Sequence, residues 1–241
     1  MTRAEPRAAA VRLAGELRAR LGQFPDGNTA VLRAIRRQVS GDIKHTSPEI
    51  VLQTALLASR ERSDRMRFVV YELINRHAAA FAALDTHALV ELGRGLNSWS
   101  SVDCFALYLS GPMWLQGRLA DRTIIDWAHA GDHWWRRAAL VSTVPLSRRG
   151  TPDQIPKVVK ICALLAADRE EMVVKALSWA LREMSKRHPQ RARAFLAEHE
   201  RNLAARVVRE VRNKLTTGLK TPRRVGRFQA RSTSSARRQS S

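Results

Sequence analysis

The sequence predicts an all-α protein built as a stack of short helical pairs. Within segments of about ten to eighteen residues, apolar side chains recur at spacings of three and four, which places them on one face of a helix. Capping residues and prolines mark where these segments begin, and glycines or prolines mark where they end. We find no sustained alternation of apolar and polar residues and no Asn-Gly hairpin signal, so we expect no strands.

Local signals place the helix boundaries in order along the chain. A capping serine before a proline, as in Ser47-Pro48-Glu49, is typical of a helix start. Similar signals predict further starts at Ser98, Asp121, Asp132 and Thr151-Pro152. Helix ends are expected at Gly111-Pro112, Gly131, Gly150 and His188-Pro189.

Between these boundaries the chain divides into four candidate pairs, at 47–77, 86–111, 121–146 and 152–187. Their mutual similarity is weak and their register is loose, which is typical of HEAT-like repeats. An irregular all-α globular domain is the alternative. We expect a single helical domain over 1–218.

The charge balance favours a polyanionic partner. The chain has 241 residues, with 42 lysines and arginines against 22 acidic residues, a net charge of +20. Such a surplus favours DNA or RNA ahead of a membrane surface. The two cysteines lie far apart, so we expect neither a disulfide framework nor a zinc site. Without a signal core or a membrane span, the sequence predicts a cytoplasmic protein, away from membranes. We also expect a monomer.

The last residues, 219–241, differ in composition from the rest. They are rich in arginine and serine and contain no acidic residue. This composition predicts disorder. The segment is either a solvated tail or a nonspecific arm for phosphates.

One carboxylate stands in an otherwise uncharged stretch. Between Arg94 and Arg118 the single charged side chain is Asp103, and Trp99 lies four residues before it. This spacing places both on one face of a helix that Ser98 would cap. Asp103 lies beside the apolar stripe, which consists of Val102, Phe105, Ala106 and Leu109. The alternative is a structural carboxylate stabilised by the helix dipole or by an arginine of a neighbouring helix.

A second helix, 170–188, places a tryptophan among cations. Its apolar stripe is Val173, Leu177, Ala180, Leu181 and Met184. Its other face presents Lys175, Trp179, Arg182 and Lys186. This arrangement fits an aromatic platform on a basic surface. The alternative is a tryptophan that packs against the next helical pair.

A third segment, 131–150, begins with Trp134, Trp135, Arg136 and Arg137 and ends with Arg148-Arg149. We expect one tryptophan to pack in the core and one arginine to reach phosphates. The alternative is an ordinary amphipathic helix with Trp135, Ala138, Ala139 and Ser142 facing inward.

Together these three segments resemble the bacterial DNA alkylation repair glycosylases of the AlkD type. The resemblance rests on Trp-x-x-Val-Asp at 99–103, Trp-x-x-Arg-x-Ala at 134–139 and Lys-Ala-x-x-Trp-x-Leu-Arg-Glu at 175–183, and covers about 50–215. It implies a HEAT-like superhelix whose concave basic face grips duplex DNA. It also implies hydrolysis of the N-glycosidic bond of cationic alkylpurines, such as 3-methyladenine and 7-methylguanine, without a metal or cofactor.

The resemblance also implies roles for individual residues. Trp99, Asp103 and Trp179 match the catalytic trio, and Arg137 and Arg182 match arginines that face the DNA backbone. We add the neighbouring cations Arg136, Lys175 and Lys186 as candidate DNA contacts. An ionised aspartate would stabilise an oxocarbenium-like transition state and position a water, and the indole faces would flank the cationic nucleotide.

Two departures bear on this interpretation. Ser100 stands where the family often has an acidic residue, and the N-terminal stretch lacks the Phe-rich segment of active members. A catalytically weak or inactive HEAT-like protein that binds damaged or branched DNA is therefore the first alternative. A HEAT-like protein-interaction scaffold is the second.

Overall fold

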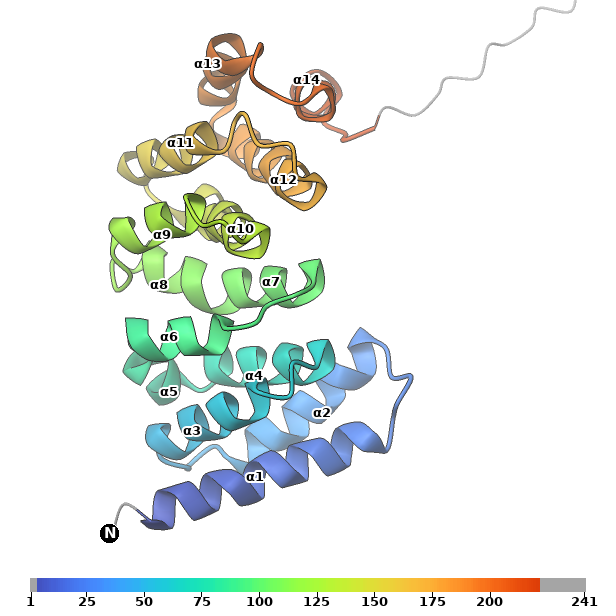
Figure 1. The fold of residues 1–241 in the computed structure, drawn as a ribbon, viewed down its shortest axis with the longest axis vertical. Coiled ribbons are helices and arrows are strands. Elements are labelled where there is room, and N and C mark those ends of the chain that lie inside the picture. The colour runs from blue at the N-terminus through green and yellow to red at the C-terminus, as the bar shows by residue number, and fades with distance from the viewer. Residues whose placement is uncertain (1–3, 222–241) are drawn as a thin grey trace, which may run out of the picture.

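The computed structural model describes residues 4–221, and these residues form a stack of helical pairs without a strand (Figure 1). The prediction of an all-α helical-repeat fold is therefore confirmed. Most of the segment 219–241 lies outside the described residues, so its disorder stays a prediction. No described helix is both long and apolar enough to cross a membrane.

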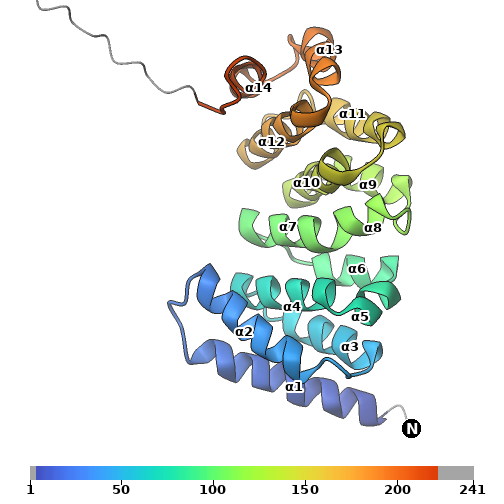
Figure 2. The same ribbon diagram turned by 180° about the vertical axis from the view of Figure 1, so that it is seen from behind.

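The helices form two rows (Figures 1 and 2). The inner row consists of α2 (Thr29–Asp42), α4 (Asp64–Arg76), α7 (Trp99–Phe105) with its continuation, α10 (His133–Arg149), α12 (Glu171–Arg187) and α14 (Ala205–Thr217). The outer row consists of α1 (Ala4–Gly22), α3 (Pro48–Ser59), α5 (Ala78–Ala83), α6 (Thr86–Gly93), α9 (Asp121–Ala128), α11 (Ile155–Leu164) and α13 (Pro189–His199). The stack bends into an arc, and both ends project toward the side on which the inner row lies.

The four predicted pairs correspond to helices in the structure. They are α3–α4, α6–α7, α9–α10 and α11–α12, and further pairs extend the stack at both ends. Ser47, Ser98 and Asp132 cap their helices through side-chain oxygens, as predicted, and Thr151 forms a capping box. Asp121 is instead the first residue of its helix, which begins after Ala120.

The predicted helix end at Gly111-Pro112 is wrong. The helix continues from α7 through a π-helical turn, η1 (Ala106–Ser110), into α8 (Gly111–Leu115). Pro112 has no N–H to donate to the carbonyl of Tyr108, four residues earlier. Asn75 of α4 donates to that carbonyl instead, at 2.7 Å, while the Gly111 N–H bonds to Ala106 in the wider π pattern. A neighbouring helix therefore satisfies the carbonyl that the proline leaves free.

Gly111 is also required for the close approach of this helix to α10. A Cβ atom at Gly111 would lie 2.7 Å from Cγ of Pro145 and 2.7 Å from the carbonyl oxygen of Ala106. Both atoms belong to rigid groups that cannot turn aside. The absence of a side chain thus lets α8 and α10 pack together.

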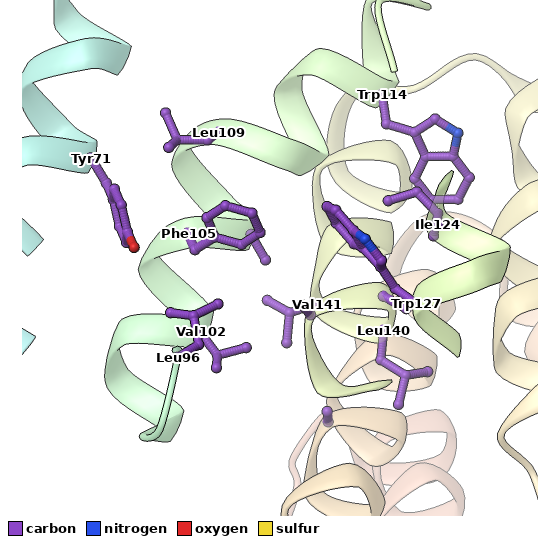
Figure 3. Close-up of a cluster of buried hydrophobic side chains, with 14 of the residues drawn as sticks. Tyr71, Leu96, Val102, Phe105, Leu109, Trp114, Ile124, Trp127, Leu140 and Val141 are labelled. Atoms are coloured by element: carbon purple, nitrogen blue, oxygen red, sulfur yellow. The ribbon is translucent and has the colours of Figure 1, made fainter. Parts of the chain in front are cut away.

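Both predicted apolar stripes are buried. Val102, Phe105 and Leu109 are fully buried, as are the stripe residues of α12. Phe105 lies between Tyr71 of α4 and Trp127 of α9, with ring centroids 5.8 Å apart in both cases (Figure 3). Such packing fixes the rotamers of its members. The end of α7, two residues after Asp103, therefore packs in a rigid aromatic core.

Hydrogen-bonded pairs join each inner helix to the next at a nearly constant offset. The paired residues are 32–39 positions apart, from Arg33–Glu72 through Ser100–Asp64, Arg137–Asp103 and Arg148–Glu183 to Ser178–Glu210. Within one interface the offset is preserved, because Arg137–Met172 and Arg148–Glu183 between α10 and α12 are both 35 residues apart. These two inner helices therefore run parallel, one repeat apart.

Candidate active site

Asp103 and Arg137 form a two-pronged ion pair between α7 and α10. Nε of Arg137 lies 2.9 Å from one carboxylate oxygen of Asp103, and a terminal guanidinium nitrogen lies 2.9 Å from the other. The α7 helix positions Asp103 one turn after its Ser98 cap, and α10 positions Arg137 just after its Asp132 cap. This fork-to-fork geometry is that of a guanidinium bound to an ionised carboxylate.

The pair extends to a third helix. The remaining terminal nitrogen of Arg137 donates to the backbone carbonyl of Met172 on α12, at 2.6 Å. All three guanidinium nitrogens of Arg137 are therefore engaged, and its side chain is 6% exposed. Arg137, predicted as a phosphate contact, is turned toward Asp103 in this structure.

Asp103 keeps limited access to solvent, with 15% of its side chain exposed. Burial raises the pKa of Asp103 above its usual range, and the hydrogen bonds and charge of Arg137 partly oppose that increase. Each carboxylate oxygen has a second lone pair that the arginine does not occupy. The carboxylate can therefore accept a hydrogen bond from a further group on its exposed side.

Trp99 is the first residue of α7, one turn before Asp103. Its side chain is 56% exposed, which is unusual for so large an apolar group. The next residue, Ser100, donates to the carboxylate of Asp64 on α4, at 2.9 Å. The neighbouring helix thus places a carboxylate beside Ser100, where the resemblance implies an acidic residue.

Trp179 lies farther along the row. Since Arg137 reaches the carbonyl of Met172, Trp179 is seven residues beyond that level on α12, or about 10 Å along the helix axis. Its indole N–H donates to Glu183 at 3.3 Å. Among the described residues, no hydrogen bond or ring contact joins Trp179 to Trp99 or Asp103. The structure therefore brings Asp103 and Arg137 together, whereas Trp179 lies in a neighbouring cluster.

Both tryptophans of α10 are half-buried and pack against the hydrophobic core. Trp135 lies against Phe105 and Trp127, with ring centroids 5.9 and 4.8 Å apart, whereas Trp134 lies against His133 at 4.4 Å. The prediction that one of the pair packs in the core and the other does not is therefore wrong.

The remaining predicted DNA contacts already have protein partners. Arg136 bonds Asp168 at 2.7 Å and two carbonyls at the end of α9, so it fastens a loop to the helix. Arg182 donates to Ser178 at 3.3 Å and lies 3.7 Å from Glu210, and burial lowers its pKa. The partly exposed Lys175 and Lys186 pair with Glu171 and Glu183, three or four residues away on the same helix. These two lysines are the most accessible of the set.

Sequence reasoning missed the carboxylates that hold these cations. Glu72, Glu183 and Glu210 are each buried between consecutive inner helices and bonded to cations of the same row. For Glu183 a signal existed, because it ends the Leu-Arg-Glu part of a motif already singled out. No group of three or more potential metal ligands occurs among residues 4–221.

Comparison with known proteins supplies one match. A family model described as DNA alkylation repair enzyme matches residues 24–215, which is most of the chain. No curated protein and no solved structure matches the chain significantly.

Proposed function

Because the chain belongs to the DNA alkylation repair enzyme family, we propose that it is a DNA glycosylase for cationic N3- and N7-alkylpurines in duplex DNA. The observation that carries this proposal is the partly exposed Asp103, paired with Arg137, one helical turn after the exposed Trp99 on the inner row of the arc. The proposed reaction is hydrolysis of the N-glycosidic bond, in which the alkylated base leaves and water adds to C1′ of the sugar.

The chemistry needs an anion close to the sugar. An alkylated purine already carries a positive charge, so it leaves without prior protonation, and the transition state resembles an oxocarbenium ion. The negative charge of Asp103 would stabilise that cation, and a free lone pair would orient the attacking water. Arg137 would keep the carboxylate ionised and fixed in place, since its guanidinium binds both oxygens.

Two tryptophans would complete the site. The exposed indole of Trp99 can lie against the nucleotide, where its π face favours positive charge. Trp179 and the accessible Lys175 and Lys186 would contact the duplex farther along the row. The net charge of +20 would supply a general attraction for the phosphate backbone.

The test is release of 7-methylguanine from methylated duplex DNA. We expect Asp103→Asn to lower the rate by at least about 100-fold while DNA binding changes little, because an amide keeps the shape but not the charge. A matched control is Asp126→Asn, which alters an exposed aspartate on the outer row that also pairs with an arginine. The control should release the base at the wild-type rate.

A second candidate function is binding of damaged or branched DNA without base release. It is favoured by the paired state of Asp103, since Arg137 binds both of its oxygens in the manner of a structural ion pair between helices. The same assay separates the two candidates. If neither wild type nor Asp103→Asn releases base, but both bind DNA in a salt-dependent manner, the protein is a binding protein.

A further inference from the structure

Three donors from two helices converge on the carboxylate of Glu183. One oxygen accepts from Nε of Arg148 on α10 at 3.0 Å. The other accepts from Nζ of Lys186 at 2.8 Å and from the indole N–H of Trp179 at 3.3 Å. Trp179, Glu183 and Lys186 follow each other at helical spacings of four and three, so they share one face of α12.

In this cluster the carboxylate of Glu183 is buried, whereas its two cationic partners are about half exposed. The side chain of Glu183 is 7% exposed, whereas those of Arg148 and Lys186 are 46% and 49% exposed. Burying a carboxylate is costly unless it is paired and hydrogen-bonded. The two cations meet that requirement and hold the pKa of Glu183 at about 2, so the group remains an acceptor across the physiological range.

Arg148 and Lys186 bind Glu183 independently of Trp179, whereas the indole N–H of Trp179 depends on Glu183 for its hydrogen bond. Apart from Glu183, no hydrogen-bond acceptor contacts the indole N–H among the described residues. Trp179 is half-buried and packs against the hydrophobic core, which limits the space open to its ring. The bond from its N–H to a fixed acceptor selects one ring orientation within that space.

We propose that Glu183 is a positioning residue that fixes the indole of Trp179, with Arg148 locking the carboxylate from the neighbouring helix. This inference rests on the proposed function, in which the Trp179 ring contacts the damaged DNA. Glu183 itself touches neither the sugar nor the base, and it acts on base release through Trp179.

The first experiment asks whether Glu183 holds the ring, and it does not depend on activity. The chain has six tryptophans, so a 15N-labelled sample gives six indole resonances. The resonance of Trp179 is the one that disappears in Trp179→Phe. We expect Glu183→Ala to shift this resonance and to speed its exchange with water. The matched control is Glu72→Ala, which removes another buried carboxylate that holds two arginines between inner helices.

The second experiment asks whether that orientation matters for base release. We expect Glu183→Ala to lower release of 7-methylguanine about tenfold in the wild type and less than about twofold in Trp179→Phe, since residues that act through one another are not additive. Glu183→Gln keeps an acceptor oxygen, so it should retain activity within about threefold of wild type and should preserve the Trp179 resonance. If Glu183→Ala does not fold, Glu183→Met, which keeps the length of the side chain but has no acceptor oxygen, takes its place in both experiments.

The outcomes distinguish a failure of the positioning role of Glu183 from a failure of the proposed glycosylase activity. An unchanged Trp179 resonance in Glu183→Ala, or an equal loss of activity in both backgrounds, overturns the positioning role. Equal behaviour of Glu183→Gln and Glu183→Ala would overturn it as well, because charge rather than hydrogen bonding would then matter. If the wild type releases no base while Glu183→Ala shifts the resonance, the positioning of Trp179 stands and the proposed glycosylase activity fails.

Discussion

Asp103 and Glu183 are both carboxylates held between consecutive helices of the inner row, but their surroundings differ. Asp103 has one cationic partner, Arg137, which is itself buried, whereas Glu183 has two partners that are about half exposed. The pKa of Asp103 is raised because burial outweighs its single arginine, whereas the pKa of Glu183 is lowered to about 2. The cations around Glu183 thus outweigh the cost of burying its charge, whereas Arg137 does not outweigh that cost for Asp103, the candidate catalytic carboxylate.

The largest expected effect is the loss of stability when Asp103, which has one cationic partner, loses that partner, compared with Glu183, which has two. Arg137→Met would leave Asp103 buried without a cation, so we expect the free energy of unfolding to fall by about 3 kcal/mol in urea titrations. Arg148→Met removes an arginine that is half exposed, and Lys186 still neutralises Glu183. That variant should lose less than about 1 kcal/mol. Equal losses for the two variants would remove the distinction between the two carboxylates.

The pH dependence of base release should follow Asp103. Since only the ionised form stabilises the cationic transition state, release should fall about tenfold per pH unit below the raised pKa of Asp103. The midpoint should therefore lie above the usual value of 3.8 for an aspartate. A profile measured with saturating DNA, alongside a binding curve at each pH, checks this. A midpoint at or below 3.8 would contradict the assignment.

The same two groups should affect stability with opposite signs. The folded pKa of Asp103 lies above its unfolded value, so its ionisation opposes folding, and this cost grows as the pH rises through that window. The folded pKa of Glu183 lies below its unfolded value. Its contribution is therefore complete above about pH 4.5 and is lost as the pH falls toward about 2. Comparing urea titrations of wild type, Asp103→Asn and Glu183→Gln across this range isolates each contribution.

The smallest expected effect concerns DNA affinity. Lys186 is half exposed and can reach a phosphate, so Lys186→Met should reduce the slope of log K against log salt by about 0.9 for duplex DNA. Arg122→Met on the outer row is the matched control and should leave the slope unchanged. A slope that is the same in both variants would place the phosphate contacts elsewhere.

The sequence predicted the parts of the fold that depend on neighbours in the chain. Stripes such as Val102, Phe105 and Leu109 follow from helical spacing, and the Ser98 and Asp132 caps follow from local residue type. Pro112 was misread as a helix end, because the donor that satisfies the carbonyl it leaves free, Asn75, belongs to another helix. A rule based on adjacent residues cannot include that hydrogen bond.

For the candidate site, the sequence singled out individual residues but could not predict which of them contact one another. Asp103 and Trp99 were identified because a lone carboxylate and a tryptophan share one helical face. Arg137 was expected to face phosphates, and its orientation toward Asp103 depends on the offset of 34 residues between α7 and α10. Glu183 was overlooked for the same reason, because its arginine comes from 35 residues earlier. Both contacts require the spacing of the repeats, which single-helix patterns do not contain.

The nearly constant offset of the bonded pairs means that every inner helix is joined to the next in a similar way. In a stack of this kind each helix is coupled mainly to its neighbours, so bending is shared among many interfaces and each helix stays rigid. The opening of the arc is then the sum of small hinge angles, one for each pair of inner helices. Loosening one interface would change the curvature of the whole arc, and with it the distances between side chains on distant inner helices, without altering any single helix.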